Sequence, residues 1–200
     1  MNNSGFEKEE IIRGEVIQEA RKLFQQYGLL KTTMEDIAKA MQKGKSTLYY
    51  YYKSKDEIFE AVVKKEIQDV FIEIRSAVEK CVTAEEKLRT YFHIAINSIR
   101  DRVLLYKIMK GEIGENAKIM VNLRNVMDSG EVNFIREILQ FGMKSREFTD
   151  IIEGDIDLMA YSVVSAFRSI TVDLVLENKF PDWDERIGIL SDVFIRGLKK

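Results

Sequence analysis

Hydrophobic side chains recur at helical spacing along most of this 200-residue chain. Between about residues 9 and 27 they follow one another at steps of three or four, which is typical of a helix with one buried face. Two shorter stretches of the same kind cover residues 33–41 and 45–52, with a turn at Gln42, Lys43 and Gly44 between them. Helices this short do not hold alone in water, because helix nucleation is costly. The pattern therefore predicts that they pack against the longer helices on either side.

Longer helical patterns cover the rest of the chain. Ser54 with Glu57 and Thr83 with Glu86 have the spacing of capping boxes and predict helices from these points to about residues 82 and 100. Less regular helical material follows over 102–115 and 117–141, then a loop over 143–154, then helices over about 155–177 and 182–198. One proline and eleven glycines leave few turns for a sheet. We therefore predict an all-α protein of about nine helices.

The last two helices are apolar on two sides. In the first of them, one stripe keeps steps of four and three, the heptad spacing that holds one face against a partner helix. A C-terminal helix pair has only one surface to bury against within its own chain, so the second surface predicts a partner subunit. The residues predicted to form that interface are Ile156, Ala160, Val163, Phe167, Ile170, Leu174, Ile187, Leu190 and Phe194.

Charge is divided unequally along the chain. The net charge is −2, yet residues 1–55 carry ten Lys or Arg against seven Asp or Glu, so residues 56–200 carry about −5. Within 31–55, six lysines face only Glu35 and Asp36. A basic patch on an acidic protein indicates a local site for a polyanion such as nucleic acid.

Several other classes of protein are disfavoured. A single cysteine and a single histidine exclude an internal disulfide framework and argue against a His-based metal site or triad. There is no signal-peptide pattern and no run of about 18 apolar residues, so a cytoplasmic protein outside the membrane is expected. Gly44-Lys45-Ser46-Thr47 resembles the end of a nucleotide-binding loop, but position 39 is Lys39 rather than glycine. We predict no cofactor and no enzyme activity.

Three motifs stand out between residues 13 and 60: Thr33-Met34-Glu35-Asp36-Ile37-Ala38, Ser46-Thr47-Leu48-Tyr49-Tyr50-Tyr51-Tyr52 and Lys53-Ser54-Lys55-Asp56-Glu57-Ile58-Phe59. With them, residues 13–60 resemble the amino-terminal domain of the TetR-type (tetracycline-repressor-like) bacterial transcriptional regulators. The resemblance implies a homodimer with a three-helix helix-turn-helix DNA-binding domain over residues 1–55. It also implies a ligand-binding and dimerisation domain, a larger helical bundle over residues 56–200 with an interface built from its last two helices. The turn at Gln42, Lys43 and Gly44 departs from the family pattern, and we expect it to be looser or differently shaped.

The second short helix carries side chains suited to both phosphate and base contacts. Leu48 occupies the buried face of this helix, so Tyr49 and Tyr50 are free to reach a DNA backbone. Tyr52 is expected to be a core aromatic. Thr33 and Lys55 stand at helix starts, where backbone amides attract phosphate. The predicted DNA-binding residues are Thr33, Lys43, Lys45, Ser46, Thr47, Tyr49, Tyr50 and Lys55.

A small-molecule pocket is predicted in the larger domain, although aromatic and methionine side chains at helical spacing are also typical of a core. The function favoured is a ligand-responsive repressor that releases a pseudo-palindromic operator on double-stranded DNA when it binds a small molecule. The alternative is a helical small-molecule-binding or scaffolding dimer without DNA binding. The candidate pocket residues are Tyr91, Phe92, Tyr106, Met109, Phe134, Tyr161 and Arg168.

Overall fold

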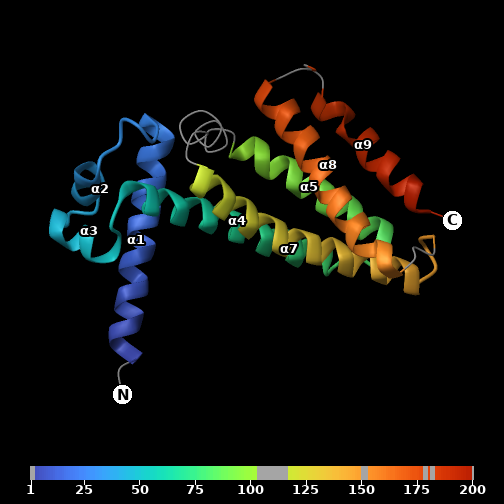
Figure 1. Cartoon of the computed structure of the whole chain (residues 1–200), viewed down its shortest axis with the longest axis horizontal. Helices are drawn as coiled ribbons and strands as arrows, with labels where there is room; N and C mark the ends of the chain where they lie inside the picture. The colour runs from blue at the N-terminus through green and yellow to red at the C-terminus, as the bar shows by residue number, and fades with distance from the viewer. Residues whose placement is uncertain (1–2, 103–116, 150–152, 178–179, 181–182, 200) are drawn as a thin grey trace. The chain divides into compact units, whose positions relative to one another are not determined.

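In a computed structural model of the chain, residues 3–102, 117–149, 153–177, 180 and 183–199 are described, and their regular elements are helices (Figure 1). The all-α prediction is confirmed for this part. The chain forms two compact units, one holding Met1–Glu66 with Leu104–Leu123, the other holding Ile67–Val103 with Arg124–Lys200. The predicted boundary after residue 55 falls at the start of α4, and the first unit continues through the first half of that helix. The roles assigned to the two domains remain predictions.

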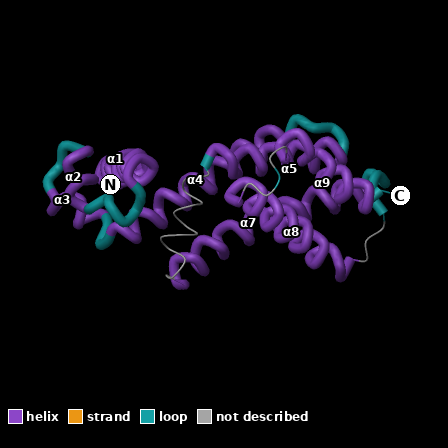
Figure 2. The backbone as a smooth tube through the Cα atoms, turned by 90° about the horizontal axis from the view of Figure 1, so that it is seen from above, coloured by secondary structure: helices purple, strands orange, loops and turns teal. Residues whose placement is uncertain are grey.

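The first unit contains α1 (Asn3–Tyr27), α2 (Met34–Ala40), α3 (Lys45–Tyr51) and the start of α4 (Lys55–Val78). Figure 2 shows α2 and α3 lying beside α1. Phe24 and Phe59 join α1 to α4, with their ring centroids 5.5 Å apart, and Ile37 and Leu48 bury α2 and α3 against them. The short helices are therefore held by the longer helices, as the nucleation argument requires.

Helix α1 begins two turns earlier than its apolar stripe predicted. The added turns contain no buried hydrophobic side chain, and Phe6 and Ile11 are exposed. Only Glu7 and Lys8 among these residues are strong helix formers, and the pair of Glu9 with Arg13, at 3.2 Å, supports the turn that follows them. Hydrophobic periodicity does not reveal a solvated helix end, because such an end buries nothing.

The turn between α2 and α3 is well formed rather than loose. The Gln42 amide donates to the Lys39 carbonyl and the Lys43 amide to the Ala38 carbonyl, each at 3.0 Å. This pair of bonds defines a Schellman C-cap, which needs a left-handed residue just after the helix. Gln42 takes that conformation with φ 54°, whereas Gly44 is extended and serves as the N-cap of α3. The expectation of a loose turn was wrong, because glutamine adopts the geometry usually left to glycine.

The second unit contains the rest of α4, α5 (Ala84–Asp101), α7 (Ala117–Lys144), a short 3₁₀ helix η1 (Glu153–Asp155), α8 (Ile156–Glu177) and α9 (Trp183–Leu198). Helix α5 contacts both α8 and α9. Helix α4 meets α7 through Arg75, whose guanidinium lies 5.0 Å from the centre of the Phe134 ring. The buried centre of this unit includes Leu88, Phe92, Ile135, Leu139, Val163 and Ile195.

The segment predicted as a loop from residue 143 is partly helical. Helix α7 continues to Lys144, and the chain then turns through Arg146, at φ 63°, to bring Phe148 into the core. Gly142 permits this path, because a Cβ atom there would overlap the Phe148 ring. The buried aromatic thus ties the end of α7 to the core.

The predicted dimer-interface residues lie mostly inside the second unit. Ile156, Ala160, Val163 and Phe167 are buried in its core, and Leu174 and Phe194 pack against that core. Their heptad stripe therefore faces the chain's own helices, and the assignment of the four buried residues to a partner surface is corrected. Ile170 is exposed and Leu190 is half-buried, while the Ile187 side chain lies outside the described residues. The large apolar side chains exposed on α8 and α9 include Leu158, Tyr161, Ile170, Ile189 and Val193.

Candidate DNA-binding surface

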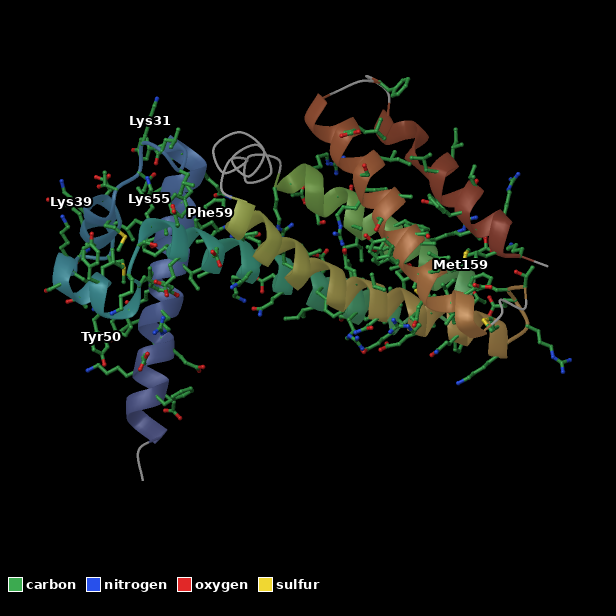
Figure 3. The ribbon with its side chains drawn as sticks, viewed as in Figure 1. Lys31, Lys39, Tyr50, Lys55, Phe59 and Met159 are labelled. Atoms are coloured by element: carbon green, nitrogen blue, oxygen red, sulfur yellow. The ribbon has the colours of Figure 1, made fainter. Side chains whose placement is uncertain are left out.

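Helix α3 presents a polar face and buries one apolar side chain. Leu48 is 1% exposed, whereas Tyr49 is 41% and Tyr50 70% exposed, and Lys45 and Ser46 are exposed as well. In Figure 3, Tyr50 points away from the body of the first unit. Tyr52 is buried, which confirms the expectation that it is a core aromatic. The helix thus offers hydroxyl and ammonium groups to a partner while it remains anchored by Leu48 and Tyr52.

Arg13 of α1 holds the carboxyl end of α3. Its Nη1 donates to the Tyr51 carbonyl at 2.9 Å, and its guanidinium lies 5.7 and 5.2 Å from the centres of the Tyr51 and Tyr52 rings. Burial raises the pKa of Tyr52, although Arg13 opposes that shift, so this phenol stays neutral. The sequence pattern does not reveal this role of Arg13, because Tyr51 lies 38 positions away and no local spacing connects the two residues.

Thr33 is the N-cap of α2. Its hydroxyl oxygen accepts from the Asp36 amide at 3.2 Å, and its own amide donates to Asp36 Oδ2 at 2.9 Å. The hydroxyl also donates to Asp36 at 2.7 Å. The bond that the Thr33 hydroxyl donates to the Asp36 carboxylate, and after it the bond from the Thr33 amide, lower the pKa of Asp36 and keep it a carboxylate. Thr33 therefore has a capping role in the structure, and its contact with DNA stays a prediction.

Lys55 does not point outward. Its Nζ donates to the carbonyls of Leu29 and Thr32, at 2.6 and 2.8 Å, and lies 3.4 Å from that of Leu30. The prediction that Lys55 binds phosphate is therefore corrected: its ammonium is directed at the protein's own backbone. Spacing along the chain gave no sign of this, because the partners lie 23 to 26 positions away.

The remaining lysines of this region are exposed. Lys45 lies 3.7 Å from Glu35, but both side chains are largely in solvent, so the pair holds Lys45 only weakly. Lys31 and Lys39 border a surface hollow of about 450 Å³, formed where α1 meets α2 and lined also by Tyr27 and Asp36. Figure 3 shows Lys31 and Lys39 on the side of the unit away from Tyr50. The positive surface thus extends beyond the predicted residues.

Three of the predicted pocket residues lie together, since the Tyr91 ring centroid is 5.4 Å from that of Phe92 and 6.5 Å from that of Phe134. Tyr91, Phe92 and Phe134 are buried in the aromatic core of the second unit, where the Phe92 and Phe167 ring centroids are 4.2 Å apart. Tyr161 is exposed, contrary to a role in lining a pocket. Arg168 is half-buried and forms an ion pair with Glu131. Tyr106 and Met109 lie outside the described residues.

Among the described residues there is no cluster of three or more His, Cys, Asp or Glu side chains able to hold a metal ion. Within the same ranges, no helix is both long and apolar enough to cross a bilayer.

Comparison with known proteins gives a family match over part of the first unit. Residues 16–62 match the family model described as bacterial regulatory proteins, tetR family. The chain is 23% identical over 185 residues to YhgD of Bacillus subtilis (strain 168), an uncharacterised HTH-type transcriptional regulator, covering 92% of this chain and 94% of the relative.

Solved structures share the fold. A transcriptional regulator from Cytophaga hutchinsonii superposes with a TM-score of 0.74 at 25% identity, over 92% of this chain and 97% of that one. The regulator FadR from Bacillus subtilis, in complex with stearoyl-CoA, gives a TM-score of 0.69 at 18% identity, over 91% and 95% of the two chains. The family match runs from α1 to the first turns of α4 and includes the exposed face of α3, so this part of the chain is similar to the bacterial regulatory proteins of the tetR family.

Proposed function

We propose that this chain is a dimeric repressor that places α3 in the major groove of a pseudo-palindromic operator, with one head, α2 and α3, in each half-site. The observation that carries the proposal is the face of α3. Its buried anchor, Leu48, leaves Lys45, Tyr49 and Tyr50 exposed on a short, firmly held helix. Recognition helices of helix-turn-helix proteins use their amino-terminal residues for base contacts.

The exposed side chains of α3 differ in length and chemistry, and so in the DNA atoms that they suit. Lys45, the first residue of α3, is the candidate for the O6 and N7 atoms of guanine, and Ser46 and Thr47 are candidates for bases or phosphates. Tyr49 and Tyr50 are long enough to donate to backbone oxygens. Thr33 and Lys43, which are both exposed, complete the proposed set.

Dimerisation would use the exposed apolar side chains of α8 and α9. A two-fold interface uses the same surface patch of both subunits, so exposed apolar side chains on α8 and α9 are a suitable surface. The residues proposed are Leu158, Tyr161, Ile170, Ile189 and Val193.

The effector is proposed to bind the second unit and to lower operator affinity by favouring a conformation in which the two heads are wrongly spaced. Because one structural neighbour is a complex with stearoyl-CoA, long-chain acyl-CoA esters are the first class of compound to test. The expected result is that an effector lowers operator affinity, and the same measurement would reveal a co-repressor as an increase.

Selection of bound sequences from random duplexes supplies the operator for the decisive test. The double variant Lys45→Ala/Tyr49→Ala should lose at least about tenfold in affinity, since each good base contact contributes about 1–3 kcal/mol. It should remain dimeric by size-exclusion chromatography. Lys80→Ala, at an exposed lysine of the second unit, is the control and should bind normally.

Unchanged affinity in the double variant would refute the assignment of α3. Failure of the wild-type chain to select any duplex, or binding without a steep dependence on salt, would favour the alternative, a small-molecule-binding or scaffolding dimer.

A further inference from the structure

Lys55, the first residue of α4, is enclosed by backbone oxygens. A lysine ammonium has three N–H donors and no acceptor. Two of them are satisfied at 2.6 Å by Leu29 and at 2.8 Å by Thr32, and the third faces Leu30 at 3.4 Å. In Figure 3 Lys55 lies within the first unit, whereas Lys31 and Lys39 reach outward. The ammonium therefore has little left to offer a phosphate.

The three carbonyls belong to one segment, the α1–α2 connection of residues 28–33. Gly28 ends α1 at φ 82°, and the Thr32 hydroxyl donates to the Gly28 carbonyl at 2.7 Å. Leu29 and Thr32 are buried, so the carbonyls near them need donors within the protein. The Lys55 ammonium donates to the carbonyls of Leu29, Leu30 and Thr32, and the Thr32 hydroxyl donates to a fourth carbonyl, that of Gly28.

This arrangement fixes α2 to α4. Thr32 directly precedes Thr33, the N-cap of α2, so a bond to the Thr32 carbonyl controls where α2 begins. A second tie joins α4 to α1 three turns later, where the Arg21 guanidinium lies 2.6 Å from the buried Glu66 carboxylate. From Ile67 onward α4 belongs to the second unit. Lys55 is thus the link between the helix shared by both units and the start of the helix-turn-helix.

We propose that Lys55 is a positioning residue: it orients α2 and α3 by holding the α1–α2 connection against the first turn of α4, and it does not bind DNA phosphate. The proposal rests on the proposed function, because orientation matters only if α3 reads an operator. Displacement of the first turn of α4 would then be passed to α2 through the Lys55 bonds.

The salt dependence of operator binding distinguishes the two roles. A plot of log K for DNA binding against the logarithm of the salt concentration has a negative slope. Loss of a lysine that contacts phosphate makes this slope shallower by about 0.9. Lys55→Met, which keeps the length of the side chain and removes the ammonium, should weaken operator binding by about tenfold or more with the slope unchanged. The matched variant Lys45→Met should lower both affinity and slope.

Binding to the selected operator and to unrelated duplex is measured for each variant at a temperature about 10–15 °C below the one at which that variant begins to melt. Lys55→Met should lose affinity for the selected operator but keep its affinity for unrelated duplex, because non-specific binding depends on phosphate contacts alone. A slope reduced by about 0.9 would overturn the proposal in favour of a phosphate contact. Unchanged operator affinity in the folded variant would overturn it in favour of a purely structural lysine.

Amide hydrogen exchange tests the proposal without DNA, so it is informative even if the proposed function fails. Lys55→Met should speed exchange over residues 29–37 by about tenfold or more, while α5 keeps its protection. Unchanged exchange over that segment would show that Lys55 does not hold the connection, and the proposal would fall.

Discussion

Single residues decide the geometry of the two connections in the first unit. Gly28 and Gln42 each follow a helix and each adopt a left-handed backbone, with φ 82° and 54°. Only glycine takes this conformation without a steric penalty, so the two positions differ in strain although they serve the same purpose. Gln42 is the first residue of the turn that departs from the family pattern, and it adopts the left-handed backbone that this turn needs.

Gln42→Gly should stabilise the protein. Relief of the left-handed strain outweighs the greater freedom of glycine in the unfolded chain, so the free energy of unfolding should rise by about 0.5–1 kcal/mol. Urea unfolding followed by circular dichroism measures the change. Gly28→Ala is the matched variant and should destabilise by about 1 kcal/mol or more, because it places a Cβ atom at a left-handed position. A Gln42→Gly protein less stable than the wild type would contradict the account.

At the scale of helices, side-chain caps define the starts of α2, α4 and α5. In α5 the Glu86 carboxylate accepts from the amides of Thr83 and Val82, at 3.1 and 3.0 Å, and the Thr83 hydroxyl accepts from Glu86. In α4 the reciprocal bond is shifted by one residue, because Glu57 accepts from Lys53 instead of Ser54. The two capping boxes predicted from spacing therefore mark true helix starts.

The caps should make stability depend on pH in the acid range. The backbone amides of Thr83 and Val82 lower the pKa of Glu86 below its usual 4.5. At a pH between the pKa of Glu86 in the folded protein and its pKa in the unfolded chain, the unfolded chain binds more protons. The stabilisation by Glu86 is therefore fully present above about pH 5 and is lost as the pH falls through the pKa of the folded state. Glu86→Gln should be less stable than the wild type at pH 7, and the difference should close by about pH 3.

Urea unfolding at both pH values measures that difference. Glu73→Gln, at an exposed position in α4 outside any cap, is the control and should match the wild type throughout. A difference in stability between Glu86→Gln and the wild type that persists at pH 3 would show that the shape of the Glu86 side chain, and not its charge, stabilises the helix start.

At the scale of the whole molecule, α8 and α9 expose apolar side chains that suit the proposed dimer. Helices α8 and α9 each have two apolar sides, and the fold uses one of them for its own core. The other carries Ile189 and Val193, which are 61% and 64% exposed, and Leu158. An exposed apolar stripe of this kind is typical of an interaction surface.

Ile189→Glu/Val193→Glu should separate the dimer. Burying two carboxylates at a two-fold interface is unfavourable, so light scattering should report a mass near the 23.3 kDa of one chain. Helical content should be unchanged, because both positions are in solvent within a single chain. Ile11→Glu, at an exposed apolar position of α1, is the control and should leave the mass unchanged. A double variant that retained twice the mass of one chain would exclude this surface.

The sequence by itself determined the helical class, most helix starts and the face of α3, because periodicity and caps act between residues a few positions apart. Leu48 and Tyr52 were assigned to the core on those grounds, and both are buried. The tertiary structure alone decided which apolar stripe of α8 turns inward and where Lys55 and Arg13 find their acceptors. These outcomes depend on contacts between residues far apart in the chain, and no local pattern encodes which distant carbonyl a side chain will meet.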